Sequence, residues 1–192
     1  MIIYVTKETF EQYEFKMPQD FSDQFVGAMA SAVLKRESGD PLLEWGGKLF
    51  YFDNRQCLQV VNFVSKLTLV LIDIKTEDKE NIPEYIVHYL FNLYENNSKM
   101  KKLLERFFED YPMACFSHLK DRSIIALLNS FQSNFLLDGY RLADYISDGI
   151  LHSIKLNKYI NCEYLLRQKS TVKWNIFIPL SVFSNYYAKD MV

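Results

Sequence analysis

Near Pro83, the hydrophobic residues of this chain change from a spacing typical of strands to one typical of helices. Before that point, three apolar runs at residues 47–52, 57–63 and 67–74 are rich in β-branched and aromatic side chains, which favours strands. The segments between them are too short for a parallel crossover, which needs about a dozen residues, so we expect antiparallel hairpins. After Pro83, apolar residues recur every three or four positions, as on one face of a helix. The sequence therefore predicts a β-meander followed by helices.

Capping and helix-breaking residues mark the expected helices. One helix is expected over residues 22–36, and a second begins at Pro83. Three more are expected from Ser98 to Pro112, from Asp121 to Asp138, and over residues 140–147. A short strand is expected at residues 2–5, and a closing hairpin at 163–167 and 172–178. Together these elements predict an α+β fold, in which a small antiparallel β-meander sheet of about four to six strands packs against four to five α-helices. We expect a single domain over residues 1–192, with a loose tail from about residue 184.

Composition limits the class of protein. With 192 residues, of which 49% are hydrophobic and 16% aromatic, the chain can bury a core. A formal net charge of −2 provides no positive field for phosphates, which disfavours nucleic-acid binding. Residues 1–7 lack the pattern of a signal peptide, and the longest apolar run, at residues 67–72, is far shorter than the roughly 20 residues that span a membrane. We expect a cytoplasmic protein without a membrane segment.

Residues that commonly bind metals are scattered along the chain. Cysteines stand at positions 57, 115 and 162 and histidines at 88, 118 and 152, and none has a second ligand at a recognised metal-site spacing. The chain also lacks a Gly-rich phosphate loop and a nucleophile elbow. We therefore expect reduced thiols, no metal and no cofactor, and the missing catalytic motifs favour a protein that is not an enzyme.

Several short motifs follow one another in an order that resembles a known family. They are Thr6-Lys7, the segment 44–49 around Trp45, Asn54-Arg55, Val61-Asn62, and the segment 120–125 with Asn129. In order and spacing they resemble the uncharacterised bacterial and phage proteins of domain-of-unknown-function family 6933. The Lys-Asp-Arg-Ser signature at residues 120–123 is the best single marker, and the similarity weakens after Leu137.

The resemblance implies a fold, a domain extent and a bacterial or phage origin. The family usually has a Trp-His pair where this chain has Trp45-Gly46. A histidine beside the tryptophan would be an acid–base candidate, so its absence weakens a catalytic interpretation of that loop. Since the family has no agreed activity, the resemblance implies little about chemistry.

Two groups of polar residues are candidate ligand sites. Asp121, Arg122 and Ser123 stand at an expected helix start, where backbone N–H groups and Arg122 could bind an anion; the alternative is that Asp121 simply caps the helix. Polar residues at the ends of neighbouring strands could form a recognition patch with Trp45, namely Asn54, Arg55 and Asn62. Alternatively, Asn54 is an ordinary turn residue.

Three functions remain open at this point. The first is a non-enzymatic binding or regulatory protein that acts through a protein partner or as a homodimer. The second is a small enzyme or sensor that binds a nucleotide-like anion through Arg55 and Arg122, with Asn62 and Asn129 as orienting groups. The third is nucleic-acid binding, which would need an exposed basic face composed of Lys99, Lys101, Lys102 and Arg106. A C-terminal aromatic cluster at residues 183–187 is a further candidate surface for docking or self-association.

Overall fold

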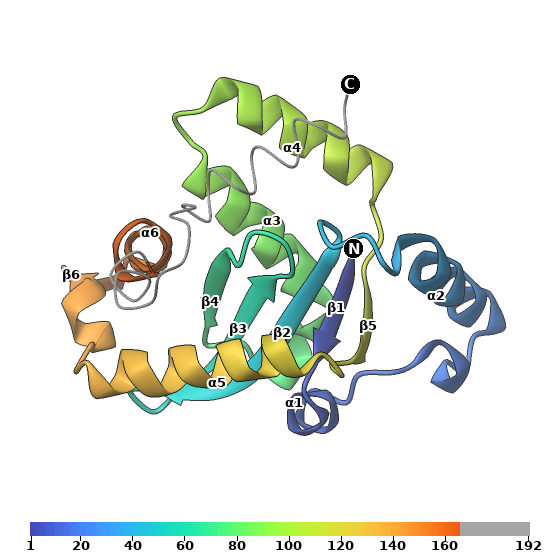
Figure 1. Ribbon diagram of the computed structural model, residues 1–192, viewed down its shortest axis with the longest axis horizontal. Helices are drawn as coiled ribbons and strands as arrows, with labels where there is room; N and C mark the ends of the chain where they lie inside the picture. The colour runs from blue at the N-terminus through green and yellow to red at the C-terminus, as the bar shows by residue number, and fades with distance from the viewer. Residues whose placement is uncertain (166–192) are drawn as a thin grey trace.

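A computed structural model describes residues 1–165 of the chain. Their main sheet has five strands in the order β4-β3-β2-β1-β5 (Figure 1). The strands are β1 (Ile2–Val5), β2 (Glu44–Phe52), β3 (Arg55–Asn62), β4 (Thr68–Ile72) and β5 (Cys115–His118). Helices cover both faces of this sheet, so the α+β class is confirmed.

The sheet is mixed, so the expectation of a purely antiparallel sheet is wrong. Strands β2, β3 and β4 form the expected meander. Strand β1, however, lies parallel to both β2 and β5, with Ile2 in register with Glu44 and Cys115. The long connections, which contain helices, allow these parallel pairings. Strand β5 has only four residues, too few for its alternation to stand out from the sequence.

The helices are α1 (Lys7–Gln12), α2 (Gln24–Glu37), α3 (Ile82–Leu93), α4 (Ser98–Asp110), α5 (Arg122–Leu137) and α6 (Ser153–Tyr159). Short 3₁₀ helices lie at Pro18–Asp20, Thr76–Asn81 and Leu142–Tyr145, and a π-helical turn at Ile160–Tyr164 follows α6. Helices α2 to α5 match expected helices to within a few residues, because their caps and apolar spacing are local signals. Helices α1 and α6 were not expected; both are short, with six and seven residues.

Two expectations near the C-terminus are corrected. The helix expected over residues 140–147 is a 3₁₀ helix followed by a hairpin of β6 (Ile146–Ser147) and β7 (Ile150–Leu151), because Asp148 and Gly149 form a turn with φ of 51° and 75°. Glu163, expected in a strand, lies in the π-helical turn. The rest of the expected closing hairpin, the aromatic cluster and the tail lie outside the described residues.

Alternate residues of the strands face two different helical layers. On one face, Leu58 and Val60 pack with residues of α3 and α4; on the other, Cys57 and Val70 pack with residues of α5 and α6. Helix α5 crosses the strands in Figure 1 and lies so close to β2 that a Cβ built on Gly46 would be 2.4 Å from Ile124 Cγ2. The sheet is therefore covered on both faces. Among the described residues, none of the helices has the length and apolar character to cross a bilayer.

Candidate functional site

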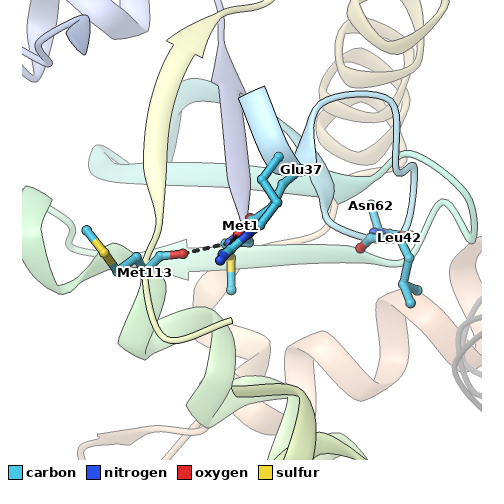
Figure 2. Close-up of polar contacts among 6 residues, drawn as sticks. Met1, Glu37, Leu42, Asn62 and Met113 are labelled. Carbon is cyan, nitrogen blue, oxygen red and sulfur yellow. Dashed lines mark hydrogen bonds and ion pairs between the residues drawn. The ribbon is translucent and has the colours of Figure 1, made fainter. Parts of the chain in front are cut away.

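Trp45 and Asn62 are register partners on β2 and β3, and both are buried. The Asn62 side-chain nitrogen donates to the Leu42 carbonyl oxygen at 2.9 Å, and Figure 2 shows these two residues side by side. The Asn62 side-chain oxygen accepts from the Ser65 backbone nitrogen and hydroxyl at 3.1 and 3.0 Å. Asn62 therefore joins the loop before β2 to the turn between β3 and β4, and its amide is occupied by bonds within the fold.

Asn54 and Arg55 lie at the other end of β3 from Asn62. The strand begins at Arg55 and ends at Asn62, which places the two residues roughly 20 Å apart at the rise of a strand. Asn54 is exposed in a turn with φ of 62°, and Arg55 Nη1 forms an ion pair with Asp73 Oδ2 at 2.6 Å. The structure therefore does not bring the four residues of the expected patch together, because successive residues of one strand lead away from each other.

Asp121 caps α5 with its own carboxylate. One oxygen accepts from the backbone nitrogens of Ser123 and Ile124 at 2.7 and 3.1 Å and from the Ser123 hydroxyl at 2.6 Å. The pKa of Asp121 is lowered, first by the Ser123 hydroxyl and then by the Ile124 backbone N–H. Because this carboxylate occupies the N–H groups that an anion would need, the geometry matches the capping interpretation of Asp121.

The other residues proposed for an anion site are also separated. Ile124, at the start of α5, lies against Gly46 of β2, whereas Arg55 is paired with Phe52 at the far end of β2. Arg122 therefore lies near one end of the sheet and Arg55 near the other. Asn129 of α5 accepts a hydrogen bond from Lys48 Nζ of β2 at 2.6 Å, which ties the helix to the sheet.

The β4 edge of the sheet is closed by two asparagines of α6 and the turn after it. Asn157 accepts from the Val70 nitrogen at 2.7 Å and donates to the Val70 oxygen at 3.1 Å. Asn161 does the same at Thr68, at 2.9 and 2.7 Å. The two side-chain amides thus stand in for a neighbouring strand, which is one way in which proteins protect a sheet edge. Two asparagines four residues apart are visible in the sequence, but we did not single them out.

The opposite edge, β5, has no such side-chain cover from the described residues. Cys115 and Leu119 direct their backbone nitrogens to Met1 and Val5 on the β1 side. Phe116 and His118 therefore direct their backbone groups outward, and within the described part of the chain no hydrogen bond reaches them. Strand β5 is half-buried at these two residues. The sheet thus has one closed edge and one edge with free hydrogen-bonding groups.

Helix α2, the helix expected over residues 22–36, exposes several of its apolar residues. Asp23 caps the helix by accepting from the Phe25 and Val26 nitrogens. Phe25, Val26 and Met29 are 72%, 40% and 36% exposed, and no charged residue occurs between Gln24 and Leu34. Ala30 and Val33, on the neighbouring part of the helix surface, pack on β1 and β5. The apolar stripe of α2 therefore extends beyond the part that the sheet covers.

The last turn of α2 lies near the segment that leads into β5. Arg36 follows Met29 by two helical turns and so lies on the same side of α2, and its guanidinium carbon is 5.6 Å from the centre of the Tyr111 ring. Tyr111 belongs to the segment that leads into β5. In Figure 1, α2 lies beside β5 at the end of the sheet. We call the exposed residues Phe25, Val26 and Met29, together with the outward groups of Phe116 and His118, the α2–β5 surface.

A buried ion pair holds this corner of the fold in place. The Met1 amino group lies 2.7 Å from Glu37 Oε2 and donates to the Met113 carbonyl oxygen at 2.7 Å (Figure 2). Glu37 is the last residue of α2 and is fully buried. The interaction thus links the end of α2, the start of β1 and the segment before β5. Because breaking a buried pair leaves an uncompensated charge, we expect it to keep α2 in one position.

Two shallow depressions lie around α6. One has a volume of about 430 Å³ and is lined by Tyr140, Asp144, Tyr145, Tyr159, Cys162 and Glu163; its remaining wall, Lys155 and Lys158, is shared with the second depression. Burial raises the pKa of Tyr145 to about 12. Beside them, the Ser147 hydroxyl of β6 and Nε2 of His152, the residue before α6, lie 2.5 Å apart. No group of three potential metal ligands occurs among residues 1–165.

Comparison with known proteins places the chain in a family. The model of a family described as a domain of unknown function (DUF6933) matches residues 2–175. The match covers all seven strands and all helices described above. No curated protein and no solved structure matches the chain. Since the matched residues span most of its length, the chain belongs to the DUF6933 family.

Proposed function

We propose that this chain is a non-enzymatic binding protein that acts through a protein partner docked on the α2–β5 surface. The observation that carries the proposal is the exposed apolar side of α2, with Phe25 72% exposed, next to a sheet edge that has no hydrogen-bond partner among residues 1–165. Exposed apolar residues that cluster, rather than stand alone, are typical of protein interaction sites. Strand edges accept extended segments of other proteins through backbone hydrogen bonds.

The chemistry of the surface favours protein over a charged ligand. Residues 24–34 carry no charge, so they offer nothing that would pair with a phosphate or a carboxylate. An apolar helix side, in contrast, gains free energy when another apolar surface removes it from water. The partner we propose therefore presents apolar side chains, and the interface core is depleted of charge, as in most protein interfaces.

The two alternative functions receive less support. Anion binding by Arg55 and Arg122 requires them to converge, yet they lie near opposite ends of the sheet. Nucleic-acid binding requires a basic side of α4, but the same helix also carries Glu105, Glu109 and Asp110. Such a mixture is typical of a solvated helix surface.

The test is site-specific photocrosslinking in cells that produce the chain. A photoreactive amino acid at Phe25 should capture a partner, and the same amino acid at Leu137, which is 82% exposed at the end of α5, should not. The substitution Met29→Asp should remove the Phe25 crosslink, while Leu137→Asp should leave it unchanged. Equal crosslinking from both positions, or a crosslink that survives Met29→Asp, would contradict the proposal.

A further inference from the structure

We propose that the depression between the 3₁₀ helix Leu142–Tyr145 and α6 binds a small organic ammonium ion, whose charged nitrogen lies among tyrosine rings and a carboxylate. The 3₁₀ helix packs against α6, which lies beside β4 at the opposite end of the sheet from α2 (Figure 1). This site therefore goes beyond the proposed function and can fail independently of it. Three features of the depression support it: its tyrosine rings, an unpaired hydroxyl and its charges.

Three tyrosines from two neighbouring segments form aromatic walls. Tyr140 precedes the 3₁₀ helix, Tyr145 ends it and Tyr159 ends α6, and all three line the depression of about 430 Å³. The centre of the Tyr159 ring is 5.4 Å from that of Tyr140 and 6.3 Å from that of Tyr145. The Tyr140 and Tyr159 hydroxyls are hydrogen-bonded to each other, and the Tyr140 ring stacks on Phe135, so these rings are held in place. Several aromatic faces around one depression are typical of sites that bind ammonium groups.

Tyr145 contributes a hydroxyl that the fold leaves unused. The residue is only 7% exposed, yet its hydroxyl has no hydrogen-bond partner within residues 1–165. Buried tyrosine hydroxyls normally find a partner. The oxygen is not fully buried, so it opens into the depression that Tyr145 lines. It can therefore accept a hydrogen bond from the N–H of a bound ligand.

The charge around this hydroxyl favours a cation. The pKa of Tyr145 is raised to about 12, first by burial and then by four other residues of the depression, Tyr159, Tyr140, Asp144 and Glu163. The two carboxylates act through their negative potential, which keeps the proton on the hydroxyl. The same potential attracts a positively charged nitrogen to this point and repels an anion.

The two lysines of the depression do not reverse this preference. Lys158 is ion-paired with Glu95, and Lys155 is exposed, so that water screens its charge. The Asp144 carboxylate accepts from the Arg141 backbone nitrogen through one oxygen, at 3.1 Å. Its other oxygen has no hydrogen-bond partner within residues 1–165 and can accept from the ligand. A volume of about 430 Å³ lies in the range of sites for small molecules.

The first test is an NMR titration of the full chain with three probes that differ only at one end. Phenethylamine carries a cation, phenethyl alcohol is neutral, and hydrocinnamate carries an anion. We expect the amine to bind at least about tenfold more tightly than either of the others and to shift the backbone amides of residues 140–145 and 155–163. Tighter binding of the anion would show that the lysines dominate and would overturn the proposal. An amine that shifts no amide in these two segments overturns it as well.

The second test uses matched substitutions. Asp144→Asn keeps the side-chain shape and an acceptor for the Arg141 nitrogen but removes the charge, so it should weaken binding of the amine about tenfold. Asp148→Asn, the same substitution in the exposed β6–β7 turn, should leave the affinity unchanged. Equal affinity for the amine in these two variants overturns the proposal.

Tyr145→Phe separates binding from folding, because it removes only the hydroxyl. Since this hydroxyl has no partner within residues 1–165, the melting temperature should not fall, while the amine should bind several-fold more weakly. Unchanged affinity for the amine would show that the hydroxyl does not contact the ligand, and would overturn the proposal.

Discussion

The two asparagines that close the β4 edge provide a direct test of the fold. Replacing Asn161 by leucine keeps a side chain of similar size but removes both hydrogen bonds to Thr68, at 2.9 and 2.7 Å. Thr68 is fully buried, so its backbone nitrogen and oxygen would then lack partners. Asn157→Leu would have the same effect at Val70.

The expected loss of stability follows from the number of orphaned groups. A buried polar group without a partner costs about 1–3 kcal/mol, so the two groups of Thr68 cost about 2–6 kcal/mol together. Leucine recovers part of this by burying apolar surface and by its better helix propensity. We therefore expect Asn161→Leu to lower the free energy of unfolding by about 2–4 kcal/mol, a large fraction of a typical total of roughly 5–15 kcal/mol.

Urea denaturation followed by circular dichroism measures this loss, and hydrogen exchange locates it. The Thr68 and Val70 amides should exchange faster in the variants, while amides of β2 keep their protection relative to global unfolding. The matched control is Asn92→Leu, because Asn92 is half-buried on α3 and its side chain bonds, among residues 1–165, only to His88 on the same helix. We expect this variant to change the free energy of unfolding by less than about 0.5 kcal/mol. If Asn157→Leu and Asn161→Leu also cost less than about 0.5 kcal/mol, the asparagines do not act as a substitute strand.

Three further predictions follow from single side chains. Gln59 is fully buried, and neither of its amide atoms has a hydrogen-bond partner within residues 1–165. Gln59→Met should therefore raise the free energy of unfolding, measured by urea titration, by about 1–3 kcal/mol. A decrease would show that the amide has a partner in solution. Asp121→Ala should cost about 1 kcal/mol at pH 7 through the lost helix cap. Because the folded pKa of Asp121 is lowered, this contribution is present above the unfolded pKa of about 3.9 and is lost as the pH falls through the folded pKa. The difference in free energy of unfolding between Asp121→Ala and the unmodified chain should therefore narrow below about pH 4. An equal difference at pH 7 and pH 2 would refute the capping role. Finally, Cys162 is exposed whereas Cys57 and Cys115 are buried, and burial raises the pKa of these two thiols to about 12 and about 11. A thiol reagent should therefore modify Cys162 first and the other two only on unfolding. Fast labelling of Cys57 in the folded protein would contradict its burial in the core.

Sequence patterns predicted the elements that local chemistry determines. The meander of β2, β3 and β4 was predicted because its apolar runs are close together and joined by short turns. Helix α5 was predicted from the Asp121 cap and its regular apolar spacing, and the structure has the cap in place. The family was also predicted from short motifs along the chain.

Candidate sites were harder to predict, because they depend on which residues meet. Asn54, Arg55 and Asn62 looked like a cluster since they flank one short strand, but a strand separates its two ends by its full length. Phe25 and Met29 looked like core residues because periodicity identifies an apolar stripe and not the surface that covers it. The roles of Asn157 and Asn161 required the position of β4, which lies almost ninety residues earlier in the sequence.

By itself, the sequence determined the α+β composition, the antiparallel meander and the positions of the main helices, because turns, caps and periodicity act over a few neighbouring residues. Only the tertiary structure decided that β1 lies parallel between β2 and β5, that one sheet edge is closed by side-chain amides, and that α2 leaves an apolar side in solvent. These features come from contacts between residues far apart in the chain, whose partners are set by the packing of the whole core and leave no local pattern.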